Sequence, residues 1–195
     1  MATKPLYGDP TASAPIFNQY AVLLGSLTAT VPVAPAAFTL NDPPTTTTEW
    51  DPVGALIEDN PFNDGEESID VTEHTAAGFG VYAKTYKNQE ETVEFTALET
   101  TLVTLGILYD ASGLTDTGTV ISGKLSQRDP TEKFLIAFQR ENATDMERRV
   151  CENYAQINTI TRNRANDRAE YTVSVTIFPT AAKELYDYYL GPLAA

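Results

Sequence analysis

Two side chains in this sequence have the chemistry that active sites most often use. His74 is the one histidine, and an imidazole titrates near neutral pH, where general acid–base catalysis works best. Cys151 is the one cysteine, and Arg148 and Arg149 precede it, an arrangement that can lower the pKa of a thiol. Neither residue has a nucleophile or base at a recognisable spacing. We therefore expect a structural role for both residues and no enzymatic activity.

An acidic segment, residues 59–67, has the oxygen-rich composition of a calcium loop. Its spacing does not match an EF-hand, because Pro61 interrupts the alternation and the sixth residue after Gly65 is Val71, not Glu. Residues 78–80 read Gly-Phe-Gly and lack the third glycine of a phosphate-binding loop. The sequence therefore predicts no metal and no cofactor.

The charge of the chain argues against tight nucleic-acid binding. Its 195 residues carry a formal net charge of -14, whereas a protein grips phosphates with lysine and arginine. No basic residue lies between Lys4 and Lys84, and a solvated acidic loop that keeps the protein soluble would account for this stretch. The lone cysteine and the absence of a secretory signal predict synthesis in a reducing cytoplasm. Apolar runs such as residues 134–138 are too short to cross a bilayer.

Three regions follow from the distribution of proline and of apolar residues. Residues 1–44 contain seven of the prolines, at positions 5, 10, 15, 32, 35, 43 and 44, and are expected to form an extended N-terminal arm. Within this arm an apolar group is expected to dock on a neighbouring subunit: Tyr20, Val22, Leu23 and Leu24. Residues 45–179 are expected to form the folded domain, and residues 180–195 a helical C-terminal tail.

The elements that would position any site are mostly strands. Period-two patterns or β-branched runs predict strands at 45–48 leading into Trp50, and at 69–71, 81–86, 92–97, 119–125, 133–140, 148–161 and 169–178. Residues 134–138 are apolar on both faces, which indicates a central strand. Residues 98–109 favour a helix, and residues 181–190 a short C-terminal one. The fold class is therefore mainly β (α+β), with antiparallel sheets and one flanking helix.

Four segments in this order resemble the major tail proteins of long-tailed, siphovirus-type bacteriophages, especially those of actinobacteria. The first begins at Trp50, the second runs from strand 93–99 into helix 102–109, the third is the arginine-led stretch 148–157, and the last is strand 171–179. The resemblance covers approximately residues 50–179.

The resemblance implies a phage tail-tube fold, an antiparallel β-sandwich or partial barrel with extended arms. It also implies a structural subunit that assembles with itself into stacked hexameric rings, the conduit for genome ejection. Sheet edges would become the joints between subunits, as in a closed barrel. Its implied partners are tape-measure, tail-terminator and baseplate or tail-tip proteins, with viral DNA passing through, and its implied location is the tail of the virion, without a membrane.

Strand alternation suggests which residues would line or border such a conduit. An acidic wall would repel the DNA phosphates and prevent long-lived contacts. In residues 89–95, Glu90 and Glu94 share one face, whereas Val93 and Phe95 face the core. In the strand 169–178 the polar face consists of Thr172, Ser174 and Thr176, and these five residues are the candidates. The competing interpretation is that these residues face outside solvent and serve solubility.

Two other functions remain open at this stage. A head-tail completion or head-decoration protein would share the acidity and the absence of catalytic motifs. A small β-sandwich binding module, for example for carbohydrate, would show aromatic residues on one sheet face, and Tyr82 and Tyr86 have a suitable spacing.

Overall fold

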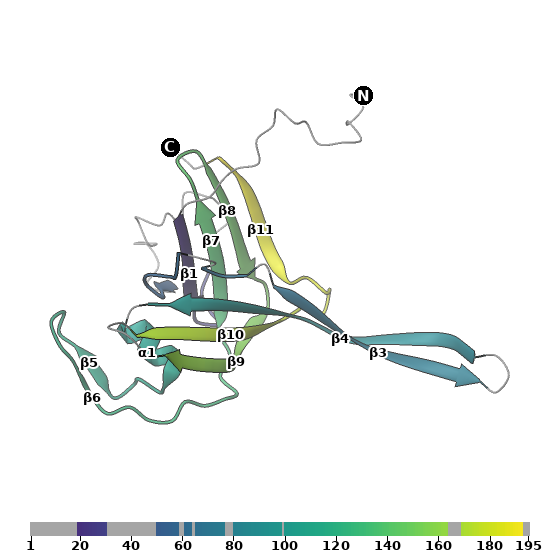
Figure 1. Cartoon of the computed structure of the whole chain (residues 1–195), viewed down its shortest axis with the longest axis horizontal. Helices are drawn as coiled ribbons and strands as arrows, with labels where there is room; N and C mark the ends of the chain where they lie inside the picture. The colour runs from purple at the N-terminus through teal and green to yellow at the C-terminus, as the bar shows by residue number, and fades with distance from the viewer. Residues whose placement is uncertain are drawn as a thin grey trace.

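A computed structural model describes residues 19–30, 50–58, 61–63, 65–76, 80–98, 100–163 and 169–192. Figure 1 shows an antiparallel β protein built from two main sheets, a small hairpin and one helix. The larger sheet has the order β11-β8-β7-β1-β2. Its strands are β1 (Gln19–Gly25), β2 (Trp50–Pro52), β7 (Leu135–Glu141), β8 (Asp145–Cys151) and β11 (Tyr186–Pro192).

The second sheet has the order β3-β4-β10-β9. Its strands are β3 (Glu66–Ala76), β4 (Gly80–Ala97), β9 (Tyr154–Asn163) and β10 (Glu170–Phe178). Strand β4 pairs with β10 through residues 91–97 only, and its first half pairs with β3 alone. The outer part of the β3–β4 hairpin therefore extends beyond the sandwich as a two-stranded ribbon, which Figure 1 shows on the right.

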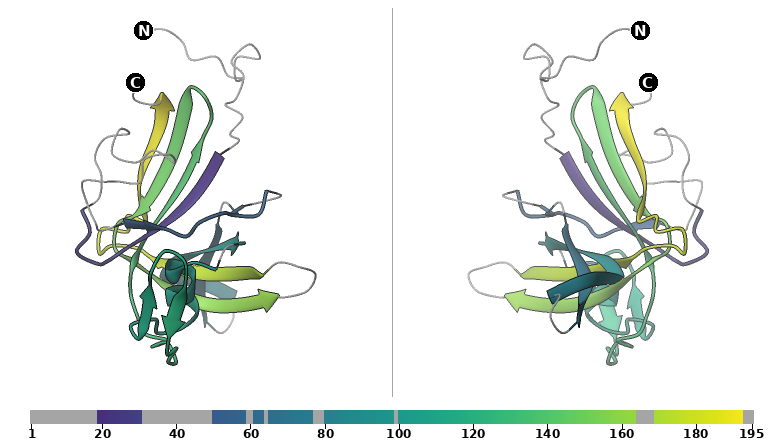
Figure 2. Two further views of the ribbon diagram at one scale, coloured as in Figure 1. Left: turned by 90° about the vertical axis from the view of Figure 1, so that its left-hand side faces the viewer. Right: turned by 90° about the vertical axis from the view of Figure 1, so that its right-hand side faces the viewer.

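The core lies between the two sheets, whose strands run in crossing directions (Figure 2). The alternation predicted for β10 is confirmed, because Tyr171, Val173, Val175 and Ile177 are at most 1% exposed. The central position predicted for residues 134–138 is also confirmed, since β7 lies between β8 and β1 and buries Leu135 to Phe138. Trp50 is buried as well, and its indole Nε1 donates to the Thr30 carbonyl at 3.1 Å.

Helix α1 (Leu102–Leu108) is the one flanking helix in the described part of the chain. It is shorter than predicted because the chain is still extended at Leu98, whose backbone N–H bonds to the Ala55 carbonyl. Thr101 caps the helix by accepting from the Thr104 N–H at 3.1 Å. After the helix come the short strands β5 (Leu114–Asp116) and β6 (Ile121–Gly123), where one strand over 119–125 was predicted.

The prediction of an extended arm is wrong for residues 19–30. Residues 16–31 contain no proline, so β1 can form, and it pairs with β7 on one side and β2 on the other. The rest of the predicted arm and the strand predicted at 45–48 lie outside the described residues.

Two further predictions are corrected by long-range pairing. Residues 148–161 are two strands in different sheets, because the chain crosses between the sheets at Glu152 and Asn153; the Asn153 amide donates to the Pro179 carbonyl at 2.8 Å. The predicted C-terminal helix is instead β11, which completes the edge of the larger sheet against β8. The tyrosines of this segment are compatible with a strand or with a helix face. The strand forms because it supplies backbone hydrogen-bond partners to the edge of β8. None of the helices in the described ranges could span a membrane.

Candidate assembly surfaces

The outer face of the four-stranded sheet, here called the polar face, brings most of the predicted wall residues together. Ser174 pairs with Glu94, Thr172 with Thr96, and Thr176 with Thr92 across the β10–β4 ladder. Glu90 follows on the same face of β4, opposite Ser68 of β3. Whether this face lines a lumen stays a prediction, but the residues proposed for it do form one surface.

The polar face is a hydrogen-bonded threonine surface with carboxylates at its border. The hydroxyls of Thr96 and Thr172 lie 3.0 Å apart, Glu94 is exposed, and Ser174 is 7% exposed between its neighbours. On β9 the face continues with Thr159 and Thr161. The register places no lysine or arginine on this face between 90 and 96, 154 and 163, or 170 and 178. The nearest described cation is therefore Lys133, which comes from outside these strands and lies over the Tyr154 ring at the border of the face.

The four apolar residues predicted to dock on a neighbour lie in this chain's own core region. Val22 is 1% and Leu23 4% exposed, and the ring of Tyr20 packs edge-on against Phe62 with centroids 5.9 Å apart. Leu24 packs against the core cluster as well. The prediction missed this because an apolar strand has the same pattern whether it joins its own sheet or a neighbour's.

The projecting part of the β3–β4 hairpin, here called the ribbon, has an exposed apolar side. Ile69, Val71 and Val81 are 42%, 48% and 46% exposed. The register places them on the ribbon side that continues the core face of the sheet, next to an ion pair between Lys84 and Glu73 at 2.7 Å. A two-stranded hairpin alone is marginally stable in water, and in the described part of the chain no second sheet covers this side. The ribbon was not predicted from the sequence. Its exposed apolar residues, Ile69, Val71 and Val81, belonged to segments that were predicted only as strands.

More exposed apolar side chains lie on β11 and at the end of the long axis away from the ribbon. On β11, an edge strand of the larger sheet, Tyr188 is 55% and Leu190 51% exposed. The end of the long axis opposite the ribbon holds α1, residues 26–30 after β1, and the β5–β6 hairpin (Figures 1 and 2). Its exposed apolar residues are Leu27, Leu102, Val120 and Leu125. Contiguous exposed apolar patches mark contact surfaces in soluble proteins, whereas single exposed apolar residues are ordinary. The ribbon side, where Ile69, Val71 and Val81 share one face, is therefore the stronger indication of a contact surface.

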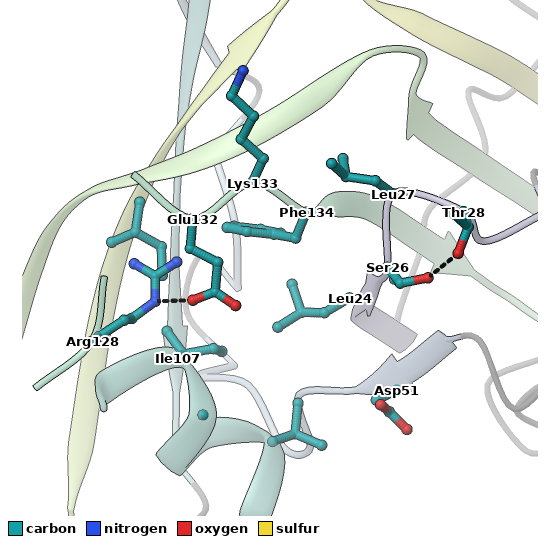
Figure 3. Close-up of a pocket in the computed structure, with 14 residues that line it drawn as sticks. Leu24, Ser26, Leu27, Thr28, Asp51, Ile107, Arg128, Glu132, Lys133 and Phe134 are labelled. Carbon is teal, nitrogen blue, oxygen red and sulfur yellow. Dashed lines mark hydrogen bonds and ion pairs between the residues drawn. The ribbon is translucent and has the colours of Figure 1, made fainter. Parts of the chain in front are cut away.

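A groove of about 710 Å³ opens at the end opposite the ribbon (Figure 3). Its apolar wall comes from three elements: Leu24 of β1, Val103 and Ile107 of α1, and Phe134 and Ile157 beside and on β9. Four charged side chains also line the groove: Asp51, Arg128, Glu132 and Lys133. Arg128 and Glu132 pair at 3.1 Å, and the Lys133 ammonium lies 3.9 Å from the ring centre of Tyr154.

A partly buried ionic cluster joins the two sheets at the base of the ribbon. The Tyr186 hydroxyl donates to the Glu91 carboxylate at 2.9 Å, and the Arg149 guanidinium lies 4.0 Å from the same oxygen. The guanidinium also stacks near the rings of Phe62, Phe138 and Tyr186. Burial, and then the charge of Glu91, raise the pKa of Tyr186. This cluster links β4 to β8 and β11.

The two residues considered for catalysis lie in different parts of the fold, one on the ribbon and one in the core. The Nε2 atom of His74 lies 2.7 Å from the hydroxyl of Thr85 on the exposed ribbon. Cys151 is buried, its sulfur accepts from the Ile136 N–H at 3.1 Å, and burial raises the pKa of its thiol to about 11. The arginines that precede it in sequence do not lower this pKa. The described ranges contain no group of His, Cys, Asp and Glu able to hold a metal ion. The side chains of Tyr82 and Tyr86 lie outside the described residues.

Among the comparisons with known proteins, the search of solved structures gives a weak likeness. No family model matches the chain, and no curated protein matches it. Among solved structures, the anti-feeding prophage cap, described as the AFP tube terminating cap, overlaps with 95% of this chain and 99% of that chain. The TM-score is 0.42 and the sequence identity is 9%. A TM-score this low does not establish a shared fold.

Proposed function

We propose that this chain is a structural subunit of a phage tail, in particular of the tail tube, and that it is not an enzyme. Copies associate head to tail into rings, expected to be hexameric, and the rings stack into a conduit for the genome. The observation that carries the proposal is the placement of exposed apolar side chains at two opposite ends of the molecule. Two different surfaces at opposite ends favour a heterologous contact, which closes into rings or continues as a filament.

The two edges of the four-stranded sheet support the same head-to-tail arrangement. Edge strand β3 carries four carboxylates and no cation: Glu66, Glu67, Asp70 and Glu73. Edge strand β9 carries no carboxylate, and its one charged residue is Arg162. Pairing β3 with another β3 would place like charges opposite each other, which destabilises a sheet. Pairing β3 of one copy with β9 of the next avoids this repulsion and continues the sheet around a ring.

In such a ring one face of the continued sheet is directed toward the axis, and we assign the polar face to this position. Duplex DNA carries a phosphate charge about every 1.7 Å along its axis, so a wall of hydroxyls and carboxylates gives it no fixed counter-charge. Glu90 and Glu94 would repel the phosphates, and the Thr172, Ser174 and Thr176 row would keep the wall hydrated. Transient passage of DNA without binding is the expected behaviour.

Electron microscopy of the purified full chain tests this proposal. Hollow tubes of stacked rings are the expected result, with the tail of a virion as the site of action and tape-measure, terminator and tail-tip proteins as further partners. Single rings that never stack would favour a head-tail completion protein instead. A chain that remains monomeric at high concentration would reject a self-assembling subunit.

A further inference from the structure

We propose that the groove beside α1 is the seat for the ribbon of a second copy, and this inference rests on the proposed head-to-tail assembly. The occupant would be the apolar side of the projecting β3–β4 hairpin, with Val71 and Val81 at its centre. The volume of the groove suits a few apolar side chains and not a whole ribbon. The side chains of one ribbon face would therefore enter it while the backbone stays outside.

Sheet geometry directs the ribbon to this groove. Ile157 of β9 lines the groove, so the groove opens beside the edge strand that we pair with β3 of the next copy. The ribbon's apolar side continues the core face of its own sheet, and Ile157 packs against the core side of the sheet that would be extended. Because side chains alternate between the two faces of a continuous sheet, the ribbon's apolar side and the groove would lie on the same side.

Charge complementarity favours the ribbon over other occupants. β3, the strand nearest to β9 in this pairing, has no lysine or arginine, and its Glu73 points to the same side as Val71. Lys133 and Glu73 are both exposed, and they would exchange their surface contacts with the Tyr154 ring and with Lys84 for each other. Glu132, in contrast, is paired with the largely buried Arg128. In Figure 3 the Lys133 side chain extends away from the apolar floor, where an incoming carboxylate can reach it. Apolar side chains would then meet the apolar wall, and Glu73 would meet Lys133.

Cross-linking between two singly substituted proteins tests the proposed contact. Cys151→Ala removes the native thiol, and Val71→Cys is then mixed with Leu27→Cys and treated with a short bismaleimide, since Leu27 lines the groove and is 52% exposed. Mixed dimers should form in the assembled fraction. Val120→Cys is the matched control, because Val120 is 58% exposed on the β5–β6 hairpin at the same end and does not line the groove. It should give no mixed product with Val71→Cys.

A charge exchange gives a second, independent readout. Lys133→Glu should weaken assembly by about fivefold, the scale of an exposed ion pair turned repulsive. Glu73→Lys with Lys84→Glu reverses the ribbon's own ion pair without removing it, and in the Lys133→Glu background it should restore assembly. Rings that form normally without the Val71–Leu27 product, or without the charge rescue, overturn the groove assignment and leave the tube proposal standing. A full chain that never associates overturns both.

Discussion

The exposed apolar side of the ribbon gives the most direct quantitative prediction. Ile69, Val71 and Val81 would be replaced together by threonine, which keeps the β-branched shape and the strand propensity of the ribbon. The ribbon should therefore stay folded while its contact surface becomes polar. If the surface is covered in an assembly, three hydroxyls would lose water without a designed partner.

The expected loss follows from the exposure of the three side chains. Burying an unpaired hydroxyl costs about 1–3 kcal/mol in protein mutational series. The residues are 42%, 48% and 46% exposed in the single chain. About half of the cost therefore remains to be incurred on association, or roughly 1.5–4 kcal/mol for the three together. At about 1.4 kcal/mol per factor of ten, the concentration for half-assembly should rise about tenfold to a thousandfold.

Sedimentation velocity over a concentration series measures this shift, with far-ultraviolet circular dichroism to verify the fold. Thr72→Ser is the control, since the register places Thr72 on the opposite side of the same strand and it is exposed. It should change the half-assembly concentration by less than about twofold. A folded triple variant that assembles as well as its parent would refute the reasoning that the ribbon side is a contact surface.

Three further predictions concern the polar face, the ionic cluster and the thiol. Glu90→Lys with Glu94→Lys should leave ring formation intact but slow genome delivery, and high salt should relieve the defect; normal delivery would remove both residues from the conduit wall. Tyr186→Phe removes the hydrogen bond to Glu91 and should lower the free energy of unfolding by about 1.5–3 kcal/mol in urea titrations, and an unchanged midpoint at constant m-value would contradict that bond. Because burial raises the pKa of the Cys151 thiol from 9.0 to about 11, its contribution to stability should be present below pH 9 and be lost toward pH 11. The folded protein should also resist thiol labelling at pH 8, and rapid labelling there would show that the sulfur is accessible.

Several features of this protein could be predicted from the sequence because they depend on local periodicity. The alternation of Val173 and Val175 with Thr172, Ser174 and Thr176 was sufficient to predict that β10 has one core face and one polar face. The same argument grouped Glu90 with Glu94 on β4. The unbroken apolar run of β7 indicated a central strand for the same reason.

Other features depend on contacts between segments far apart in the chain, and a pattern of residues does not say which partner a strand will find. Only the tertiary structure places β1 between β7 and β2, divides 148–161 between two sheets, and makes β11 a strand. The ribbon's Val71 and Val81 have the same β-branched pattern as core residues, so their exposure could not be inferred. The groove combines side chains of β1, α1 and β9, whose proximity arises only when the two sheets pack. Composition and period therefore determine that this chain folds as sheets, whereas long-range pairing decides which faces stay uncovered for another subunit.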